Sequence, residues 1–268
     1  MRIKLVVSDV DGTIVTTDKD VAPSTVRAAA RLREMGIPLS IVSARPPRGM
    51  AYIQETLGLT GPLAGFNGGR MLAPDGTVLS EHVVPETSAR AALELFEARG
   101  IFVFVFSGDD WLVRDFDGPH VAHERHTVRY DPVVVESFEP YLASVSKMVG
   151  VSDDEPMLAE AEIALQGLIG DAATVKRSQT YYLDLTARKA NKGNAIKLLA
   201  DVLGIAVGEI AVIGDMENDV PMFATAGFSV AMGNASDSVK AEASAAAKAD
   251  NDHGGWAEAV DMLILAHS

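Results

Sequence analysis

Two short apolar runs near the beginning of the chain each end abruptly in polar residues. Residues 5–7 lead into the acidic stretch 8–13, and residues 37–42 lead into the polar stretch 43–45. Runs of this length without a polar interruption suit strands that are covered on both faces, as in a parallel sheet. Between them, residues 23–35 place apolar side chains at helical spacing, with proline in the first turn and glycine just after the end. The opening is therefore predicted to be β-α-β.

The same order of elements returns near the end of the chain. A helix is predicted for residues 193–203, with Ala195, Leu198, Leu199 and Val202 on its apolar face, and a strand for 209–213 that ends in Gly214-Asp215. A short helix over 219–226 and a strand over 228–232 follow. The alanine-rich stretch 241–249 is predicted to be a helix of small residues against the core.

The middle of the chain has a different character. Its pattern predicts a mixture of helices and strands of the α+β type, over residues 88–98, 101–106, 111–116, 145–151, 156–168 and 181–185. We expect a doubly wound, mostly parallel, Rossmann-like α/β core formed by residues 1–84 and 187–268, with residues 85–186 inserted as an α+β domain. Phe102, Phe104 and Phe106 are predicted to form one buried strand face, and His120, His123 and His126 to lie in a solvated loop.

The charge balance limits the partners of the chain. There are 23 Lys and Arg residues against 37 Asp and Glu residues, which gives a net charge of −14 and opposes binding to nucleic acid or anionic lipid. The absence of cysteine excludes disulfides and thiolate chemistry and fits a reducing cytoplasm. No apolar run approaches the roughly 18 residues of a membrane-spanning helix, and the first residues lack the apolar segment of a signal peptide. We expect a cytoplasmic chain without a membrane or nucleic-acid partner.

Acidic residues follow two of the predicted strands. Asp9 and Asp11 lie two positions apart, so in an extended chain both carboxylates point the same way, and a divalent cation would compensate their repulsion. An acidic turn that caps a helix explains the pair equally well. Asp215 also follows a strand, and in a parallel sheet it reaches the same edge. Three carboxylates there predict a Mg²⁺ site, the alternative for Asp215 being the start of a turn.

Two further residues could bind phosphate at that edge. Ser43 offers a hydroxyl and a backbone amide where the second strand ends, and Lys192 offers a positive charge near a helix N-terminus. Taken singly, the serine is as readily explained as a turn former and the lysine as a solvated side chain.

In chain order, these motifs resemble a known family. Asp9-Val10-Asp11-Gly12-Thr13, Ser43, Lys192 and Gly214-Asp215-x-x-Asn218-Asp219 resemble the four motifs of the haloacid dehalogenase (HAD) superfamily of phosphohydrolases. The long insertion, together with residues 182–186 and 191–195, resembles the Cof-type branch, whose large α+β cap is of the C2 (IIB) type. The likeness spans nearly the whole chain. Ala44 departs from it, because the family usually has glycine at this position.

The resemblance implies a Mg²⁺-dependent phosphatase of small phosphorylated metabolites. By similarity, Asp9 is the nucleophile that forms an aspartyl-phosphate, and Asp11 protonates the leaving group and then activates water. The implied Mg²⁺ ligands are Asp9, the backbone carbonyl of Asp11, and Asp215, while Ser43 and Lys192 bind the phosphoryl oxygens.

Further residues have supporting roles. Asn218 and Asp219 would orient Lys192 or metal-bound water by similarity, and Thr13 can bind a carboxylate or a turn amide. Asn67-Gly68 resembles an Asn-Gly turn of the family in which Asn67 contacts substrate, and it also fits a plain hairpin turn. Arg45 either adds positive potential at the mouth of the site or simply pairs with a surface acid.

Other functions fit parts of this pattern. A phosphomutase or phosphotransferase would use the same aspartyl-phosphate with an acceptor other than water. A phospho-acceptor binding module of the response-regulator type also gathers acids, a hydroxyl and a lysine around Mg²⁺, but it is small and its lysine follows the acceptor aspartate. A catalytically idle relative is the third alternative. Sugar phosphates, phosphoglycolate, flavin mononucleotide and pyridoxal phosphate all fit as substrates, and the chain could be a monomer or a homodimer.

Overall fold

The computed structural model describes residues 3–266, and the chain divides into two compact units. The first unit combines the described residues up to Leu79 with those from Asn191 onward, and the second is Ser80–Ala190. The fold is of the mixed α/β class with a largely parallel sheet, as predicted. The domain boundaries predicted at 84/85 and 186/187, and the role of the second unit as a cap, stay predictions.

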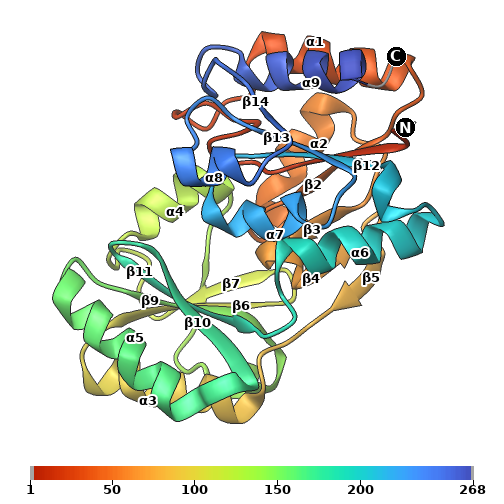
Figure 1. Ribbon diagram of the computed structural model, residues 1–268. Helices are drawn as coiled ribbons and strands as arrows, with labels where there is room; N and C mark the ends of the chain where they lie inside the picture. Colours follow the sequence, from red (N-terminus) through yellow and green to blue (C-terminus); the bar gives the residue numbers. More distant parts are fainter. Residues whose placement is uncertain (1–2, 267–268) are drawn as a thin grey trace. The chain divides into compact units, whose positions relative to one another are not determined.

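Within the described part of the chain, the first unit is built on an eight-stranded sheet (Figure 1). Neighbouring strands from β14 to β3 run parallel, and β4 returns antiparallel to β3. In their order across the sheet the strands are β14 (Ala245–Ala246), β13 (Phe228–Ala231), β12 (Ile210–Gly214), β1 (Leu5–Ser8), β2 (Leu39–Val42), β3 (Leu63–Gly65), β4 (Arg70–Leu72) and β5 (Val78–Glu81).

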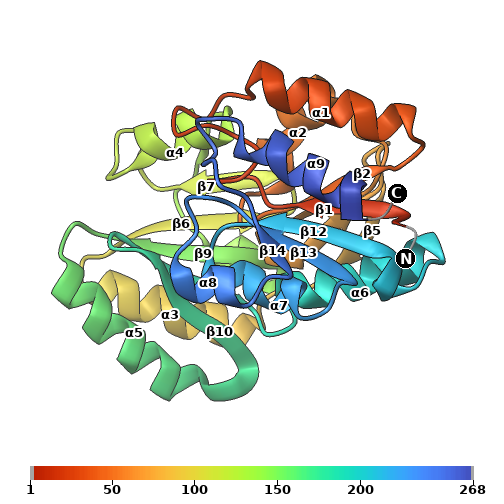
Figure 2. The same cartoon turned by 45° about the horizontal axis from the view of Figure 1, so that its top comes forward.

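Helices cover both faces of this sheet, which is why its central strands are apolar on both sides. Val6 packs with α1 (Pro23–Glu34), α2 (Ala51–Leu57) and α9 (Gly255–Ala266). Its neighbours Leu5 and Val7 point the other way and pack with α6, α7 and α8. Figures 1 and 2 show α1 and α9 side by side on their face. The second set of helices is α6 (Lys192–Leu203), α7 (Val220–Phe223) and α8 (Asp237–Ala241).

Short 3-10 turns complete the connections in the first unit. They are η1 (Pro47–Met50), η2 (Phe66–Gly68), η5 (Val207–Glu209) and η6 (Glu217–Asp219). Because β1, β2, β12 and β13 run in the same direction, the loops that follow them open at one edge of the sheet. The fold therefore brings the polar residues that end these strands to a common place.

The second unit carries a six-stranded sheet, mostly antiparallel, within residues 80–190, all of which are described. Two helices, α3 (Glu86–Ala98) and α5 (Glu155–Ile169), pack together on one of its faces (Figure 1). Across the sheet the strands are β10 (Ala173–Gln179), β11 (Tyr182–Ala187), β9 (Val145–Val151), β6 (Phe102–Ser107), β7 (Asp110–Val113) and β8 (Val133–Val134). Helix α4 (Val121–Val128) and the turns η3 (Glu139–Ser144) and η4 (Gly170–Ala172) complete the unit.

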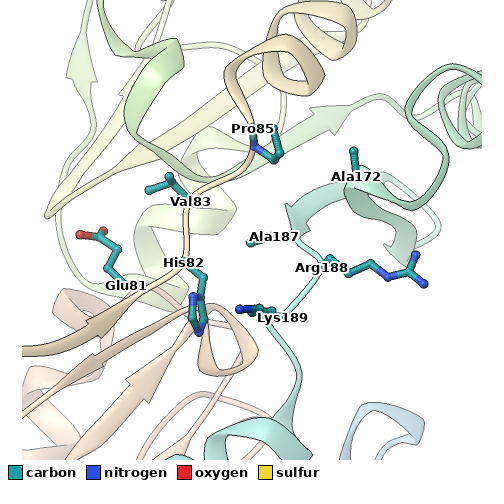
Figure 3. Close-up of a pocket in the computed structure, with 8 residues that line it drawn as sticks. All are labelled: Glu81, His82, Val83, Pro85, Ala172, Ala187, Arg188 and Lys189. Atoms are coloured by element: carbon teal, nitrogen blue, oxygen red, sulfur yellow. The ribbon is translucent and has the colours of Figure 1, made fainter.

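A cavity of about 330 Å³ lies in the second unit, where its first and last segments run beside each other (Figure 3). His82 and Lys189 both line this cavity, and Figure 3 shows the side chain of Arg188 extending away from it. No residue predicted for the functional site lines this cavity, whose lining is Glu81, His82, Val83, Pro85, Ala172, Ala187, Arg188 and Lys189.

Three local predictions are wrong. The stretch 241–249 is not a helix, because Ala245–Ala246 pairs with β13 as the edge strand β14. His123 and His126 lie in helix α4 rather than in a loop, and His120 immediately precedes it. Val202 is exposed on α6, whose buried face runs through Ala195, Ile196, Leu199 and Ala200.

The predicted face of Phe102, Phe104 and Phe106 is only partly buried at Phe102. The intervening residues Val103 and Val105 are buried against α3 and α5, so this strand is covered on both sides. Among the described helices, none has both the length and the apolar character needed to cross a membrane.

Candidate active site

Three carboxylates meet at the carboxyl edge of the first unit's sheet. Oxygen atoms of Asp9, Asp215 and Asp219 lie within 4.8 Å of one another, and all three residues are buried. Asp9 directly follows β1, and Asp215 directly follows β12, the strand beside it. Three buried negative charges this close repel one another strongly, so the group needs positive charge or protons to persist.

Lys192 supplies part of that positive charge. Its ammonium nitrogen lies 2.5 Å from Oδ1 of Asp9 and 2.5 Å from Oδ1 of Asp219, and its side chain is 1% exposed. The residue stands in the first turn of α6, which begins where the side chain of Asn191 accepts a hydrogen bond from the backbone N–H of Asn194. Burial alone would lower the pKa of Lys192, but the two carboxylates outweigh burial and raise it.

Asp9 and Asp215 have raised pKa values. Burial raises the pKa of Asp9 well above its ordinary value and outweighs the attraction of Lys192. Burial, together with the charge of Asp219, raises the pKa of Asp215 to about 6. A cation bound between these carboxylates would compete with their protons and favour the ionised form.

Asp219 uses both of its oxygens inside the protein. Oδ1 pairs with Lys192, and Oδ2 accepts hydrogen bonds of 2.9 Å from the backbone N–H groups of Asp215 and Met216. A side chain at Gly214 would collide with this carboxylate, which explains the glycine. Asp219 therefore shapes the loop that presents Asp215 and also orients Lys192.

Asp215 is held from two sides. The hydroxyl of Thr13 donates to Oδ1 at 2.9 Å, and Nδ2 of Asn234 donates to Oδ2 at 3.1 Å. Asn234 also donates to the backbone carbonyl of Gly12 at 2.9 Å. Gly12 has a φ of +73°, and a Cβ there would overlap the carboxylate of Asp215, so only glycine fits this approach of the two strand ends.

The carboxylate of Asp11 is not part of the acid group. The chain turns after Asp9, with the N–H groups of Thr13 and Val15 bonded to the carbonyl of Val10, so the alternation of an extended strand does not reach Asp11. Nε and Nη2 of Arg45 each donate to Asp11 at 2.7 Å, and Nζ of Lys19 lies 2.8 Å from Oδ1. Burial acts to raise the pKa of Asp11, but Arg45 and Lys19 outweigh it and lower that pKa far below its ordinary range.

Arg45 pairs with Asp11, a predicted site residue, and its contribution to substrate binding stays a prediction. Its side chain is only 3% exposed, and it forms a two-pronged ion pair with Asp11. The charges of Asp11 and Tyr52 and their hydrogen bonds outweigh burial and raise the pKa of Arg45.

Ser43 and the Asn67-Gly68 turn lie in contact through the backbone. The carbonyl of Ser43 accepts a 2.7 Å hydrogen bond from the N–H of Asn67, and the Ser43 hydroxyl accepts one of 3.2 Å from the N–H of Arg45. Asn67 has a φ of 58° in the turn between β3 and β4, so the hairpin interpretation describes its geometry. Its side chain also accepts a 3.2 Å hydrogen bond from Asn218. Contact of Asn67 or Gly68 with a substrate stays a prediction.

Three residues around these groups were not anticipated from the sequence. Asn234 follows β13 in a Gly-Asn pair, so the rule that drew attention to Asp9 and Asp215 applies to it as well. Lys19 and Tyr52 reach the site from a loop and from α2. No sequence spacing predicts these two contacts, because they depend on how the loop after β1 folds back over the sheet edge.

Comparisons with known proteins agree with this architecture. A family model described as haloacid dehalogenase-like hydrolase matches residues 6–260. The chain belongs to this family. It is an enzyme, a phosphatase of the phosphoric monoester hydrolase class, and not a non-enzymatic binding module.

Particular relatives are similar over most of their length. The HMP-PP phosphatase of Cronobacter sakazakii is 29% identical over 236 residues, which cover 87% of this chain and 85% of that protein. A haloacid dehalogenase-like hydrolase from Bacteroides thetaiotaomicron superposes with a TM-score of 0.91 at 26% identity, covering 98% of this chain and 100% of that one. A subclass IIB sugar phosphatase shares the fold, with a TM-score of 0.85 at 22% identity over 98% of this chain and 99% of that one.

Proposed function

We propose that this phosphatase is Mg²⁺-dependent and hydrolyses small phosphorylated metabolites through an aspartyl-phosphate on Asp9. The observation that carries the proposal is the buried group of Asp9, Asp215 and Asp219 around Lys192 at the carboxyl edge of a parallel sheet. In open α/β sheets this edge is where ligands bind.

The residues at this edge fit a divalent metal ion. Asp9 and Asp215 offer buried oxygens near each other, and they would hold the ion together with the backbone carbonyl of Asp11. Asp219 is a poorer ligand, because both of its oxygens already accept hydrogen bonds from protein groups. When bound, Mg²⁺ supplies positive charge that offsets the repulsion between a carboxylate nucleophile and a phosphate dianion, about 4 kcal/mol per pair of unit charges at 4 Å.

Asp9 is suited to attack the phosphorus atom. Oδ1 is fixed by Lys192, and among the described residues no hydrogen bond reaches Oδ2, which is therefore the oxygen we assign to the attack. The new bond joins Oδ2 to phosphorus while the bond from phosphorus to the ester oxygen breaks. Lys192 and the hydroxyl of Ser43 would stabilise the phosphoryl oxygens during the transfer, whereas the backbone N–H of Ser43 already donates to the carbonyl of Ala64 at 2.9 Å.

Asp11 would move protons in both halves of the reaction. Arg45 and Lys19 hold it ionised in this arrangement, the form that takes a proton from the water that attacks the aspartyl-phosphate. A substrate dianion brings negative charge toward Asp11 and so raises its pKa, which favours the protonated form needed by the leaving group.

We propose substrates of the sugar phosphate or phosphoglycolate type. Relatives named as an HMP-PP phosphatase and as a sugar phosphatase support small organic phosphate esters in general. The second unit, as the inserted domain, would select among them.

A panel of phosphorylated metabolites, assayed for phosphate release with Mg²⁺ and with a chelator, tests the proposal. We expect turnover of one or more members that the chelator removes and Mg²⁺ restores. D9N should retain the fold, judged by circular dichroism, and lose nearly all turnover. Substantial turnover by D9N, or turnover unaffected by chelation, would contradict the proposal. Transfer of phosphate to an acceptor without its release would instead identify a phosphotransferase.

A further inference from the structure

Lys19 is held in an uncommon backbone conformation beside the active site. Its φ is 66°, in the left-handed region that residues other than glycine, asparagine and aspartate seldom adopt. Its ammonium nitrogen lies 2.8 Å from Oδ1 of Asp11, and its backbone carbonyl accepts a 3.0 Å hydrogen bond from the hydroxyl of Tyr52. Both its side chain and its main chain are thus fixed, which is what such a conformation requires.

The hydroxyl of Tyr52 joins the two residues that hold Asp11. While it donates to the carbonyl of Lys19, it accepts a 3.2 Å hydrogen bond from Nη1 of Arg45. Arg45 in turn donates from Nε and Nη2 to the two oxygens of Asp11. One phenol oxygen on α2 therefore links the loop after β1 to the loop after β2, and through them it fixes the orientation of one carboxylate.

The loop that carries Lys19 has other anchors. The backbone N–H and the hydroxyl of Thr17 each donate to Asp252 at 2.7 Å, and Nδ2 of Asn251 donates to the carbonyl of Val15 at 3.0 Å. Val15 also forms a bridge with Val21. Because these contacts hold the loop independently of Tyr52, we expect Y52F to keep the loop folded.

We infer that Lys19 and Tyr52 are positioning residues that hold the carboxylate of Asp11 for proton transfer to the leaving group. The inference rests on the proposed function, since Asp11 is the proton donor only there. A positioning role has a specific consequence. Loss of either residue should lower kcat/KM most for substrates whose leaving group needs a proton. An alkyl phosphate needs one to release its alkoxide, whereas p-nitrophenyl phosphate releases a stable phenolate without it.

The first experiment compares Y52F with Y141F in the intact chain. Tyr141 is a partly buried tyrosine of the second unit, so its variant controls for the loss of a phenol oxygen. The measured quantity is kcat/KM for an alkyl phosphate divided by kcat/KM for p-nitrophenyl phosphate, because kcat/KM reports the steps up to departure of the leaving group. We expect Y52F to lower this ratio about tenfold, since a small misplacement of a catalytic group costs this much or more, and Y141F to leave it unchanged.

The second experiment compares K19M and K19R with K4M. Lys4 forms an exposed 2.7 Å ion pair with Glu209, so K4M removes a similar charge and contact elsewhere. K19M should lower the ratio, and K19R should restore part of it because arginine can still reach a carboxylate. A general loss of positive charge would weaken both substrates alike and leave the ratio unchanged.

D11N separates the two ways in which these experiments can fail. If D11N lowers the ratio but Y52F and K19M do not, the positioning role is wrong and the proposed function stands. If D11N lowers kcat/KM equally for both substrates, Asp11 is not the proton donor, and the assignment within the proposed function is wrong. Equal losses for both substrates in Y52F, with the ratio kept, would also overturn the positioning role.

Discussion

Lys192 and Asp9 lie 183 residues apart in the sequence, yet the ammonium nitrogen of one is 2.5 Å from Oδ1 of the other inside the first unit. The same nitrogen lies 2.5 Å from Asp219, so one cation serves two buried acids. Asp215 completes the group but pairs with neutral donors, Thr13 and Asn234. Neutralising the three carboxylates therefore depends on Lys192 and on the metal ion that we propose to bind beside it.

Replacing Lys192 by methionine should abolish turnover and destabilise the first unit. The variant leaves Asp9 and Asp219 buried without their cation, which costs about 3–5 kcal/mol in comparable buried pairs. The free energy of unfolding, measured in urea by the fluorescence of Trp256 in a W111F background, reports this unit, because the chain has two tryptophans and Trp111 lies in the other unit. Mg²⁺ should recover part of the loss. K4M is the exposed control, and an equal stability of K192M and K4M would contradict the assignment.

The stabilisation by Mg²⁺ should grow with pH. The pKa of Asp215 is about 6 in the folded chain against 3.8 for the ordinary side chain, so between these values the folded state binds more protons and loses stability as pH rises. A metal ion competes with that proton and therefore gains affinity over the same range. The rise in Tm caused by Mg²⁺ should be larger at about pH 7.5 than at about pH 5. D215N should show no such difference, and an equal rise at both pH values in the unmodified chain would refute the prediction.

N234A should raise the Mg²⁺ concentration needed for half-maximal activity. Asn234 donates to Asp215, a proposed metal ligand, and to the carbonyl of Gly12, which directly follows the proposed ligand Asp11. Loss of a hydrogen bond behind a metal ligand typically weakens metal affinity about 10–100-fold. Q54A is the matched control, since Gln54 donates a 3.1 Å amide hydrogen bond to Pro74 at an exposed position. If both variants have the same Mg²⁺ requirement, Asn234 has no role at the metal.

Much of the site follows from strand ends, a feature that the sequence shows directly. Asp9, Ser43 and Asp215 each end an apolar run, and parallel pairing of β12, β1 and β2 brings those ends to one edge. Asn234 lies a few residues beyond the end of β13 and carries no charge, so it drew no attention in a search for carboxylates. The contacts of Lys19 and Tyr52 with the residues around Asp11 depend on a loop that folds back through tertiary contacts, and no local pattern encodes them.

The wrong local predictions have similar causes. Residues 241–249 are rich in alanine, which favours a helix, but two of them gain backbone hydrogen bonds at the open edge of β13 and become a strand instead. The polar stretch around His123 lacks a continuous apolar face, so it does not look helical. Tertiary contacts anchor α4 within the second unit: Val121 and Val128 at its ends are buried, and Glu124 accepts a 3.3 Å hydrogen bond from the hydroxyl of Tyr182.

Replacing both members of the ion pair between Lys147 and Asp184 in the second unit should cost less stability than replacing one of them. Nζ of Lys147 lies 2.7 Å from Oδ2 of Asp184, each side chain is 11% exposed, and no group of the described residues donates to Oδ1 of Asp184. K147M leaves a buried charge unpaired and should cost about 3–5 kcal/mol, whereas K147M/D184L removes both charges and should recover most of that loss. Unfolding in urea, followed by Trp111 fluorescence in a W256F background, measures this unit. The exposed pair of Arg90 and Glu139 is the control, and R90M should cost less than about 1 kcal/mol. A double variant no more stable than K147M would mean that Asp184 contributes something other than its pairing with Lys147.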